Sequence, residues 1–194
     1  MYGNTRQLIG VVESFEYLRW TRRYSQCGAF EIKAIATPVN IALLTLGNLL
    51  WKSDDEEVGI IEHLEMNQAD KETITVSGRF ATSLLAKRII WGTETLNGDL
   101  SACALQLINN HLISPSNTNR QITGVAFTSP VLGVTVNTQV SYKNLMDTVI
   151  GLCDASDRGI KTVFNQASGD LVVTLYAGAV SQAVFSSEYE NLTS

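Results

Sequence analysis

Hydrophobic and polar positions alternate with a period close to two over residues 13–35, the part of the chain richest in large aromatic rings. Before the central turn, Phe15 and Tyr17 fall on one face, and after it Phe30 and Ile32 share a face. Two β-prone runs on either side of a glycine-containing turn predict a β-hairpin. Because aromatic side chains bury large areas, we expect one ring-bearing face of this hairpin to seed the pairing of later strands.

The first half of the chain continues with short, mostly β-prone runs. Thr37 is suited to cap a helix and Pro38 to occupy its first position, although the apolar residues of 38–46 would also suit a buried strand. The run 72–78 predicts a strand that pairs with 58–66 across a polar loop. In order, we expect a strand at 8–17 that leads into the hairpin, a helix at 38–46, strands at 49–52, 58–66 and 72–78, a helix at 80–88 and a strand at 89–91.

A helical period replaces the strand pattern after residue 99. Asp99 is placed to cap a helix at 100–113, in which apolar residues recur every three or four positions. A further helix is expected at 142–156, with Gly159 just beyond its last turn. Strands are expected at 121–127 and 133–139, and a hairpin at 160–164 and 171–176.

These patterns predict an α+β protein. We expect a β-rich domain at residues 1–95 and, after a boundary at 96–99, an α+β domain of two helices on an antiparallel sheet that extends to residue 178. The apolar run within 179–194 is followed by no strand partner, so we expect it to begin a further unit that this sequence leaves incomplete.

Composition is that of an ordinary folded protein with a lightly charged surface. A chain of 194 residues with 45% hydrophobic side chains can bury a core without disulfides or metals. The net charge of −5 and the pI of about 5.0 argue against specific nucleic-acid binding. No run approaches the ~20 apolar residues that span a bilayer, so no membrane insertion is expected. Cys27, Cys103 and Cys153 are scattered, which predicts reduced thiols in a cytosolic product.

No pattern typical of an enzyme or a cofactor site is present in the sequence. His63 and His111 lie in no recognised motif and are expected to be structural or surface residues. The acidic run 54–57 lacks the spaced ligands and central glycine of a calcium loop, so a solvated turn is expected. Cys27 is expected to be a small turn residue and not a reactive thiol. We therefore predict no catalytic residue, metal ligand or cofactor, and no enzymatic activity.

Aromatic rings and arginines are concentrated in the first hairpin. The candidate site residues are Trp20, Arg22, Arg23, Tyr24 and Phe30. Such a group could stack on nucleic-acid bases or sugars. Aromatic residues and arginine are also enriched at protein interfaces. We therefore expect these five residues to form an assembly interface or to anchor the core.

The same hairpin resembles the opening of a family of siphovirus tail proteins, found in phages and prophages of Gram-positive bacteria. The residues that carry this resemblance are Leu18, Trp20, Arg22, Arg23, Tyr24, Ser25, Cys27, Gly28, Phe30, Glu31 and Ile32. Weaker matches follow in order at 59–62, 76–79, 84–90 and 185–192. The resemblance thus covers nearly the whole chain, and its most specific part is the string at 20–32.

The resemblance implies a structural protein of the tail tip, similar to baseplate hubs, with no catalytic residues. Such hubs have two β-barrel-like domains with an α/β domain between them, and three copies present six similar barrels to a sixfold tail tube. Residues 1–95 would be the hub barrel, and most of a second barrel, which would begin at 179–194, would be missing, because family members are usually longer.

The resemblance also implies partners and a location. The expected partners are further copies of the chain, in a homotrimer, and other tail proteins such as distal tail, tail tube and tape measure proteins. The expected location is the virion tail tip, after assembly in the bacterial cytoplasm. Net negative charge agrees with a ring around the tail channel, because a DNA conduit should repel phosphates.

Two other functions stay open on the sequence. A tail-associated cell-wall hydrolase would need a cleft with perturbed acids or a metal. A receptor-binding module for cell-surface glycans would hold its ligand on exposed aromatic side chains, of which Trp20 is the candidate.

Overall fold

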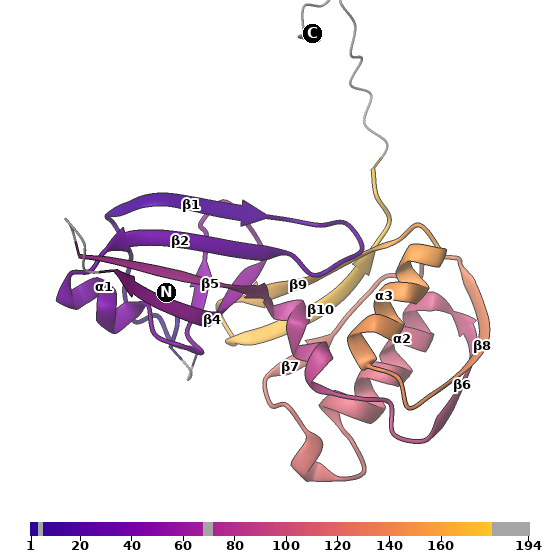
Figure 1. Cartoon of the computed structure of the whole chain (residues 1–194). Coiled ribbons are helices and arrows are strands. Elements are labelled where there is room, and N and C mark those ends of the chain that lie inside the picture. Colours follow the sequence, from indigo (N-terminus) through magenta and orange to yellow (C-terminus); the bar gives the residue numbers. More distant parts are fainter. Residues whose placement is uncertain (4–5, 68–71, 180–194) are drawn as a thin grey trace, which may run out of the picture.

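The computed structural model describes residues 1–3, 6–67 and 72–179 (Figure 1). The strands are β1 (Phe15–Thr21), β2 (Ala29–Ile35), β3 (Leu49–Trp51), β4 (Val58–Asn67), β5 (Thr73–Phe80), β6 (Thr93–Asp99), β7 (Val125–Phe127), β8 (Thr135–Ser141), β9 (Gly159–Asn165) and β10 (Asp170–Tyr176). The α-helices are α1 (Pro38–Leu43), α2 (Leu100–Ile108) and α3 (Leu145–Ala155). Two 3₁₀ helices, η1 (Ala81–Lys87) and η3 (Thr118–Arg120), and a π-helical turn, η2 (Asn109–Ile113), complete the order.

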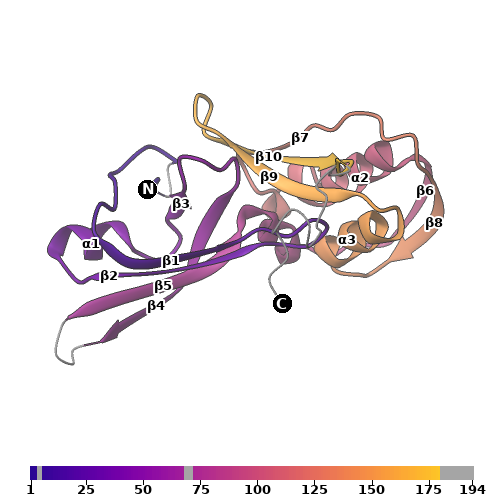
Figure 2. The same ribbon diagram turned by 90° about the horizontal axis from the view of Figure 1, so that it is seen from above.

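The first five strands form one antiparallel sheet in the order β1-β2-β5-β4-β3. Both hairpins predicted for this half of the chain are present, since β1 pairs with β2 and β4 pairs with β5. The sheet curls, and β3 and the N-terminus lie across from β1 and β2 (Figure 2). Within the described residues no ladder joins β1 to β3, so the sheet is a half-barrel with open edges.

The inner face of the half-barrel is apolar. Its fully buried side chains include Phe30, Ile32, Ile74, Val76 and Phe80. From β1, Leu18 and Trp20 pack against this cluster, whereas Phe15 and Tyr17 are 48% and 40% exposed. The expectation that the first hairpin buries its rings on one face is therefore wrong for β1. Side chains alternate along a strand, and from Tyr17 onward the inward set of β1 is the even-numbered one. A bulge between Phe15 and Tyr17 interrupts this alternation.

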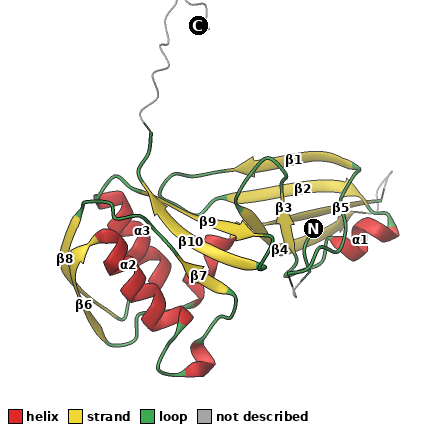
Figure 3. Cartoon of the chain, turned by 180° about the vertical axis from the view of Figure 1, so that it is seen from behind, coloured by secondary structure: helices red, strands yellow, loops and turns green. Residues whose placement is uncertain are grey.

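The second half of the chain has two small sheets instead of the one antiparallel sheet expected. The first has the order β7-β10-β9, in which β10 is antiparallel to β9 and parallel to β7. Parallel pairing needs a crossover, which the β8–α3 segment between β7 and β9 supplies. The second is a ribbon of β6 and β8. Helices α2 and α3 lie between the two sheets (Figure 3), so the α+β class is confirmed.

Helix starts follow the capping residues in the sequence. Thr37, Asp99 and Asn144 accept hydrogen bonds from backbone N–H groups in the first turns of α1, α2 and α3. The predicted stripe of α2 and η2 is completely buried, and its members are Leu100, Ala104, Leu107, Ile108 and Leu112. The caps and this stripe are why the sequence located α2 correctly.

The end of α3 differs from the expected glycine stop. Asp157, with φ of 50°, takes the left-handed position, and the Arg158 N–H donates to the Cys153 carbonyl in the pattern of a helix C-cap. Gly159 has another reason to be glycine. A Cβ there would lie 2.3 Å from the Tyr176 ring, which packs directly on the backbone of β9.

Two further strand predictions are wrong. Residues 89–91 form no strand, because Ile89 makes only an isolated bridge with Asn144. The strand predicted at 8–17 begins at Phe15. A strand that was not expected, β6, includes residues 96–99, which therefore form no linker. The division into residues 1–95 and 96–178 stays a prediction, and the expected start of a second barrel at 179–194 lies, beyond residue 179, outside the described residues.

Candidate assembly surface

The turn of the first hairpin lies where the half-barrel meets the β9–β10 hairpin (Figure 1). The Tyr24 ring packs edge-on against Tyr176, with centroids 5.5 Å apart. Its hydroxyl donates to the Asp157 carbonyl at 3.0 Å and accepts from the Gly178 N–H at 2.9 Å. The Ile160 N–H donates to the Tyr24 carbonyl at 3.0 Å. Tyr24 therefore ties the two halves of the chain together within one subunit.

Trp20 and Phe30 lie inside the half-barrel. They are paired across β1 and β2, and their ring centroids are 5.7 Å apart. The Trp20 ring also lies 4.6 Å from that of Phe80, which is completely buried. Gly28 leaves room for this stack, because a Cβ there would come within 2.5 Å of the Phe80 ring.

The acidic run 54–57 is only in part the solvated turn that was expected, because Asp54 and Glu56 are exposed but the two acids between and after them are buried. Asp55 is 9% exposed and Glu57 is 4% exposed. The Asp55 carboxylate accepts hydrogen bonds from the Trp20 indole N–H and the Glu57 N–H, both at 2.9 Å, and its carbonyl accepts from the Trp51 indole at 2.8 Å. Buried carboxylates persist only with such partners. Asp55 and Glu57 thus form a buried polar cluster between β1, β3 and β4.

Arg22 neutralises part of this cluster from its half-exposed position. Its Nε lies 3.7 Å from Asp55 Oδ2 and 3.4 Å from Glu57 Oε2. Burial nevertheless raises the pKa of Glu57 to about 7, against the opposing attraction of Arg22. The neighbouring residue Glu56 faces outward and pairs with Lys161 of β9 at 2.7 Å.

The five candidate residues are therefore divided among three environments. Trp20 and Phe30 pack in the core, and Arg22 covers the buried acids. Tyr24 joins the two halves of the chain, while Arg23 is exposed and donates to Gln26 at 3.0 Å. Contact with another copy stays a prediction for these residues. The sequence analysis missed Asp55 and Glu57, whose partners Trp20 and Arg22 are more than thirty positions away and leave no local signal.

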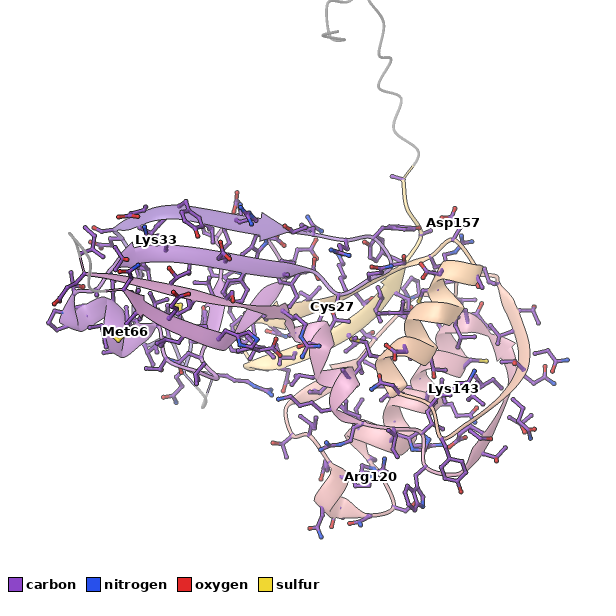
Figure 4. All side chains as sticks on the ribbon, in the orientation of Figure 1. Cys27, Lys33, Met66, Arg120, Lys143 and Asp157 are labelled. Atoms are coloured by element: carbon purple, nitrogen blue, oxygen red, sulfur yellow. The ribbon has the colours of Figure 1, made fainter. Side chains whose placement is uncertain are left out.

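The sheet surface of the half-barrel carries exposed apolar side chains. They are Phe15, Tyr17, Ile35, Leu64 and Met66, between 39% and 48% exposed. Tyr17 and Ile35 lie on the outer face, whereas the other three pair with the inward-facing residues of β2 and β5. Charged pairs lie among them, including Lys33 with Glu16 at 2.7 Å. Lys33 and Met66 are labelled on this part of the molecule in Figure 4. Because β1 is an edge strand, this surface combines exposed apolar area with backbone groups that face no neighbouring strand.

The cysteine and histidine side chains of the described ranges are dispersed over the fold. No group of three His, Cys, Asp or Glu side chains in the described ranges could hold a metal ion. Burial raises the pKa of the Cys27 thiol to about 11, which disfavours the thiolate. His63 is exposed, and His111 is buried against Glu94. Among the described helices, none is long and apolar enough to cross a bilayer.

Replacing Trp20 by Phe should destabilise the fold by about 2 kcal/mol. The change removes the indole N–H that the buried Asp55 carboxylate accepts and leaves a small gap against Phe80. Urea unfolding followed by circular dichroism measures the effect. Trp91→Phe is the matched control, because Trp91 is 67% exposed, and it should change stability by less than about 0.5 kcal/mol. Equal losses in the two variants would contradict the role of the Trp20–Asp55 bond.

A model of the Siphovirus ReqiPepy6 Gp37-like proteins matches residues 2–194. The chain belongs to this family of siphovirus proteins. The resemblance carried by the first hairpin is thus confirmed. No curated protein matches the sequence.

Solved structures of tail proteins share the fold of this family member at low sequence identity. The prophage tail protein gp18 of Listeria monocytogenes EGD-e has a TM-score of 0.58 and 10% identity, over 89% of this chain and 49% of that protein. The c3393 protein of E. coli is a type VI secretion component described as structurally similar to the T4 tail proteins gp27 and gp5. It has a TM-score of 0.53 and 11% identity, over 85% and 47% of the two chains.

A tail protein of Neisseria meningitidis MC58 gives a TM-score of 0.51 and 14% identity, over 82% of this chain and 46% of that one. The chain therefore spans about half the length of each of these structures. At such identities the likeness establishes the fold alone, namely an α+β chain with a curled half-barrel similar to those of phage tail proteins.

Proposed function

We propose that this chain is a structural component of a phage or prophage tail tip, of the baseplate-hub type, that helps to form a ring at the end of the tail tube. The observation that carries the proposal is the curled half-barrel of an α+β fold similar to those of tail proteins, in a chain that belongs to a siphovirus family. The protein would act by its shape and its contacts, as a component of the virion tail assembled in the bacterial cytoplasm.

The open half-barrel supplies the surfaces that a ring requires. β1 is an edge strand, and exposed apolar side chains lie on and beside it. An edge strand can extend a sheet across a subunit boundary, and a closed ring needs two different surfaces that meet head to tail. In the proposed homotrimer, the outer surface of β1 and β2 meets another part of the neighbouring copy. Distal tail, tail tube and tape measure proteins are the proposed further partners.

The proposed role involves no catalysis and no cofactor. The buried carboxylates Asp55 and Glu57 are held by Trp20, Arg22 and backbone groups, so they join structural elements. Tail-associated cell-wall hydrolysis would require an acid or a metal aligned in an accessible cleft. Of these acids, Glu57 has the strongly raised pKa, and it is only 4% exposed.

Measurement of mass in solution tests the ring. We expect light scattering to give the mass of a trimer, either for the present chain or for a chain extended to the length of the solved tail proteins. Tyr17→Lys and Ile35→Lys, at side chains that are 40% and 46% exposed on the outer face of β1 and β2, should shift the mass to that of a monomer. A charge placed in an apolar contact is costly, whereas it is harmless on a free surface.

Val131→Lys is the matched control for these variants. Val131 is an exposed aliphatic side chain (82%) in the loop before β8, in the other half of the molecule. It should leave the trimer intact. A chain that stays monomeric in both its present and its extended length, with or without tail tube protein, would refute the hub proposal.

A further inference from the structure

A polar cavity of about 840 Å³ lies in the helical part of the molecule. Six of its lining residues are Trp91, Glu94, Asn110, His111, Asn117 and Arg120. The volume is that of a pocket for a small organic ligand. In Figure 4, Arg120 marks the end of the molecule that points away from the half-barrel. The site is therefore separate from the surfaces assigned to assembly.

An exposed aromatic pair stands at the mouth of this cavity, where Trp91 belongs to the lining and Tyr142 packs against Trp91 from outside it. Trp91 is 67% exposed and Tyr142 is 65% exposed, yet their rings are held edge to face with centroids 5.9 Å apart. The Arg120 guanidinium carbon lies 5.9 Å from the Trp91 ring centre, and its Nη2 donates to the Ile89 carbonyl at 2.6 Å. Apolar rings of this size are usually withdrawn from water. Here they are fixed in place while they face solvent.

A hydrogen-bonded network forms the opposite wall. Glu94 accepts from Gln106 Nε2 at 2.7 Å and from Asn110 Nδ2 at 3.1 Å, and His111 Nε2 lies 3.1 Å from its Oε1. The Trp91 N–H donates to His111 Nδ1 at 3.4 Å, which favours the neutral imidazole with its proton on Nε2, facing Glu94. Glu94 is thereby occupied by partners from the protein. Of these partners, Asn110 and His111 line the cavity, so the carboxylate fixes lining side chains instead of being free.

Two irregularities of the backbone coincide with this wall and this mouth. His111 lies in the π-helical turn η2, which interrupts the helical stripe that α2 begins. Tyr142 has φ of 49°, a conformation that is unfavourable for a bulky side chain. Single π turns and strained residues occur often at binding sites, where a required geometry compensates for the local loss of stability.

We propose that this cavity binds a carbohydrate. A pyranose ring has an apolar C–H face that fits against the Trp91–Tyr142 pair and an edge of hydroxyl groups that fits a wall of amides. The rest of the lining agrees, since Ser114, Ser116 and Asn117 add hydroxyl and amide groups. The aliphatic members of the lining are Ile89 and Pro115. A protein partner would need a larger apolar area than these residues offer.

The charges of the site also favour a sugar over a simple anion. Arg120 is the cation of the lining, and Glu94 is its acid, so no excess of positive charge accumulates there. The inference does not depend on the hub role, and it differs from glycan binding at the first hairpin. Trp20 cannot serve as a stacking platform, because its ring packs on Phe80 and its N–H is bonded to Asp55.

Saturation-transfer difference NMR on the whole chain tests the proposal. The probes are the methyl glycosides of glucose, galactose, N-acetylglucosamine and rhamnose, with inorganic phosphate as a separate arm followed by ³¹P line width. We expect at least one glycoside to bind saturably in the millimolar range. Trp91→Ala should weaken its binding at least tenfold. Val131→Ala, which trims an 82% exposed side chain in the loop before β8, should leave it unchanged.

Arg120→Ala gives a second measure that keeps both aromatic rings, and it should weaken binding of the same glycoside severalfold. Failure of all four glycosides to bind excludes the carbohydrate. Binding of phosphate alone, abolished in Arg120→Ala, would assign the cavity to an anion and contradict the proposal. Glycoside binding that survives Trp91→Ala contradicts the proposal as well. So does a change of oligomeric mass in Trp91→Ala when no glycoside binds, because it would mark the aromatic pair as a protein contact.

Discussion

Gly78→Ala is expected to destabilise the half-barrel by about 3 kcal/mol or more. Gly78 lies in β5 between β2 and β4, opposite Phe30 on one side and Ile61 on the other. A Cβ at this position would lie 1.8 Å from the Ile60 carbonyl oxygen and 3.1 Å from the Glu62 nitrogen. These are backbone atoms of a paired strand, so no rotamer change can relieve the overlap.

The close approach has an identifiable cause in β4. The register between β4 and β5 shifts between Ile61 and His63, which leaves Glu62 as the extra residue of a β-bulge. A bulge bends its strand and raises the local twist. Here it presses the backbone of β4 onto Gly78, and the resulting bend contributes to the curl of the sheet. Substitution at Gly78 should therefore disturb the curvature as well as the stability.

Urea unfolding of Gly78→Ala against wild type measures this effect, and Gly151→Ala is the matched control. Gly151 lies in α3, is exposed, and has no atom within 4 Å of the position that a Cβ would take. Alanine there should stabilise the protein by roughly 0.5–1 kcal/mol, because glycine in a helix has more conformational entropy to lose. A Gly78→Ala variant as stable as wild type would contradict the packing described for the bulge.

The sequence predicted those elements whose signal is local. Asp99 and Thr37 lie next to the helices they cap, and the hairpin β9–β10 has alternating apolar residues on both sides of a polar turn. By contrast, β6 has the sequence TETLNGD, in which Leu96 is the buried residue. One apolar position gives no period, so this strand becomes apparent only when Leu96 meets the helices between the sheets.

The candidate site was predicted less well because its chemistry depends on distant partners. A run of four acidic residues is normally solvated, yet Asp55 and Glu57 are buried because Trp20, Arg22 and Trp51 supply donors to them. The rings of the first hairpin are also divided between two faces, and composition alone does not show which face turns inward. The pairing of Trp20 with Phe30 decides it, because that pair packs on Phe80 in β5.

Glu57→Gln is expected to stabilise the protein at high pH and to have little effect near pH 4. Burial raises the pKa of Glu57 from its usual 4.5 to about 7. Between these values the unfolded chain has lost the proton and the folded chain keeps it. The contribution of Glu57 to the free energy of unfolding is therefore fully present below about pH 4.5 and is lost as the pH rises through 7. Glutamine stays neutral and avoids this loss, so the variant should gain up to about 3 kcal/mol at pH 8.

Urea unfolding at intervals from pH 4 to pH 8 measures the difference in stability between Glu57→Gln and wild type. Glu62→Gln is the control, in which the stability difference should have the opposite sign. The pKa of Glu62 is lowered by its hydrogen bonds with Arg79, both at 2.8 Å. Its contribution is therefore present above its usual pKa and is lost as the pH falls, so Glu62→Gln should be destabilising at pH 8 and neutral in acid. If Glu57→Gln gave a difference independent of pH, the Glu57 carboxylate could not be the group that titrates. In an Arg22→Ala background the gain from Glu57→Gln should be larger, because the guanidinium opposes the effect of burial on the pKa of Glu57.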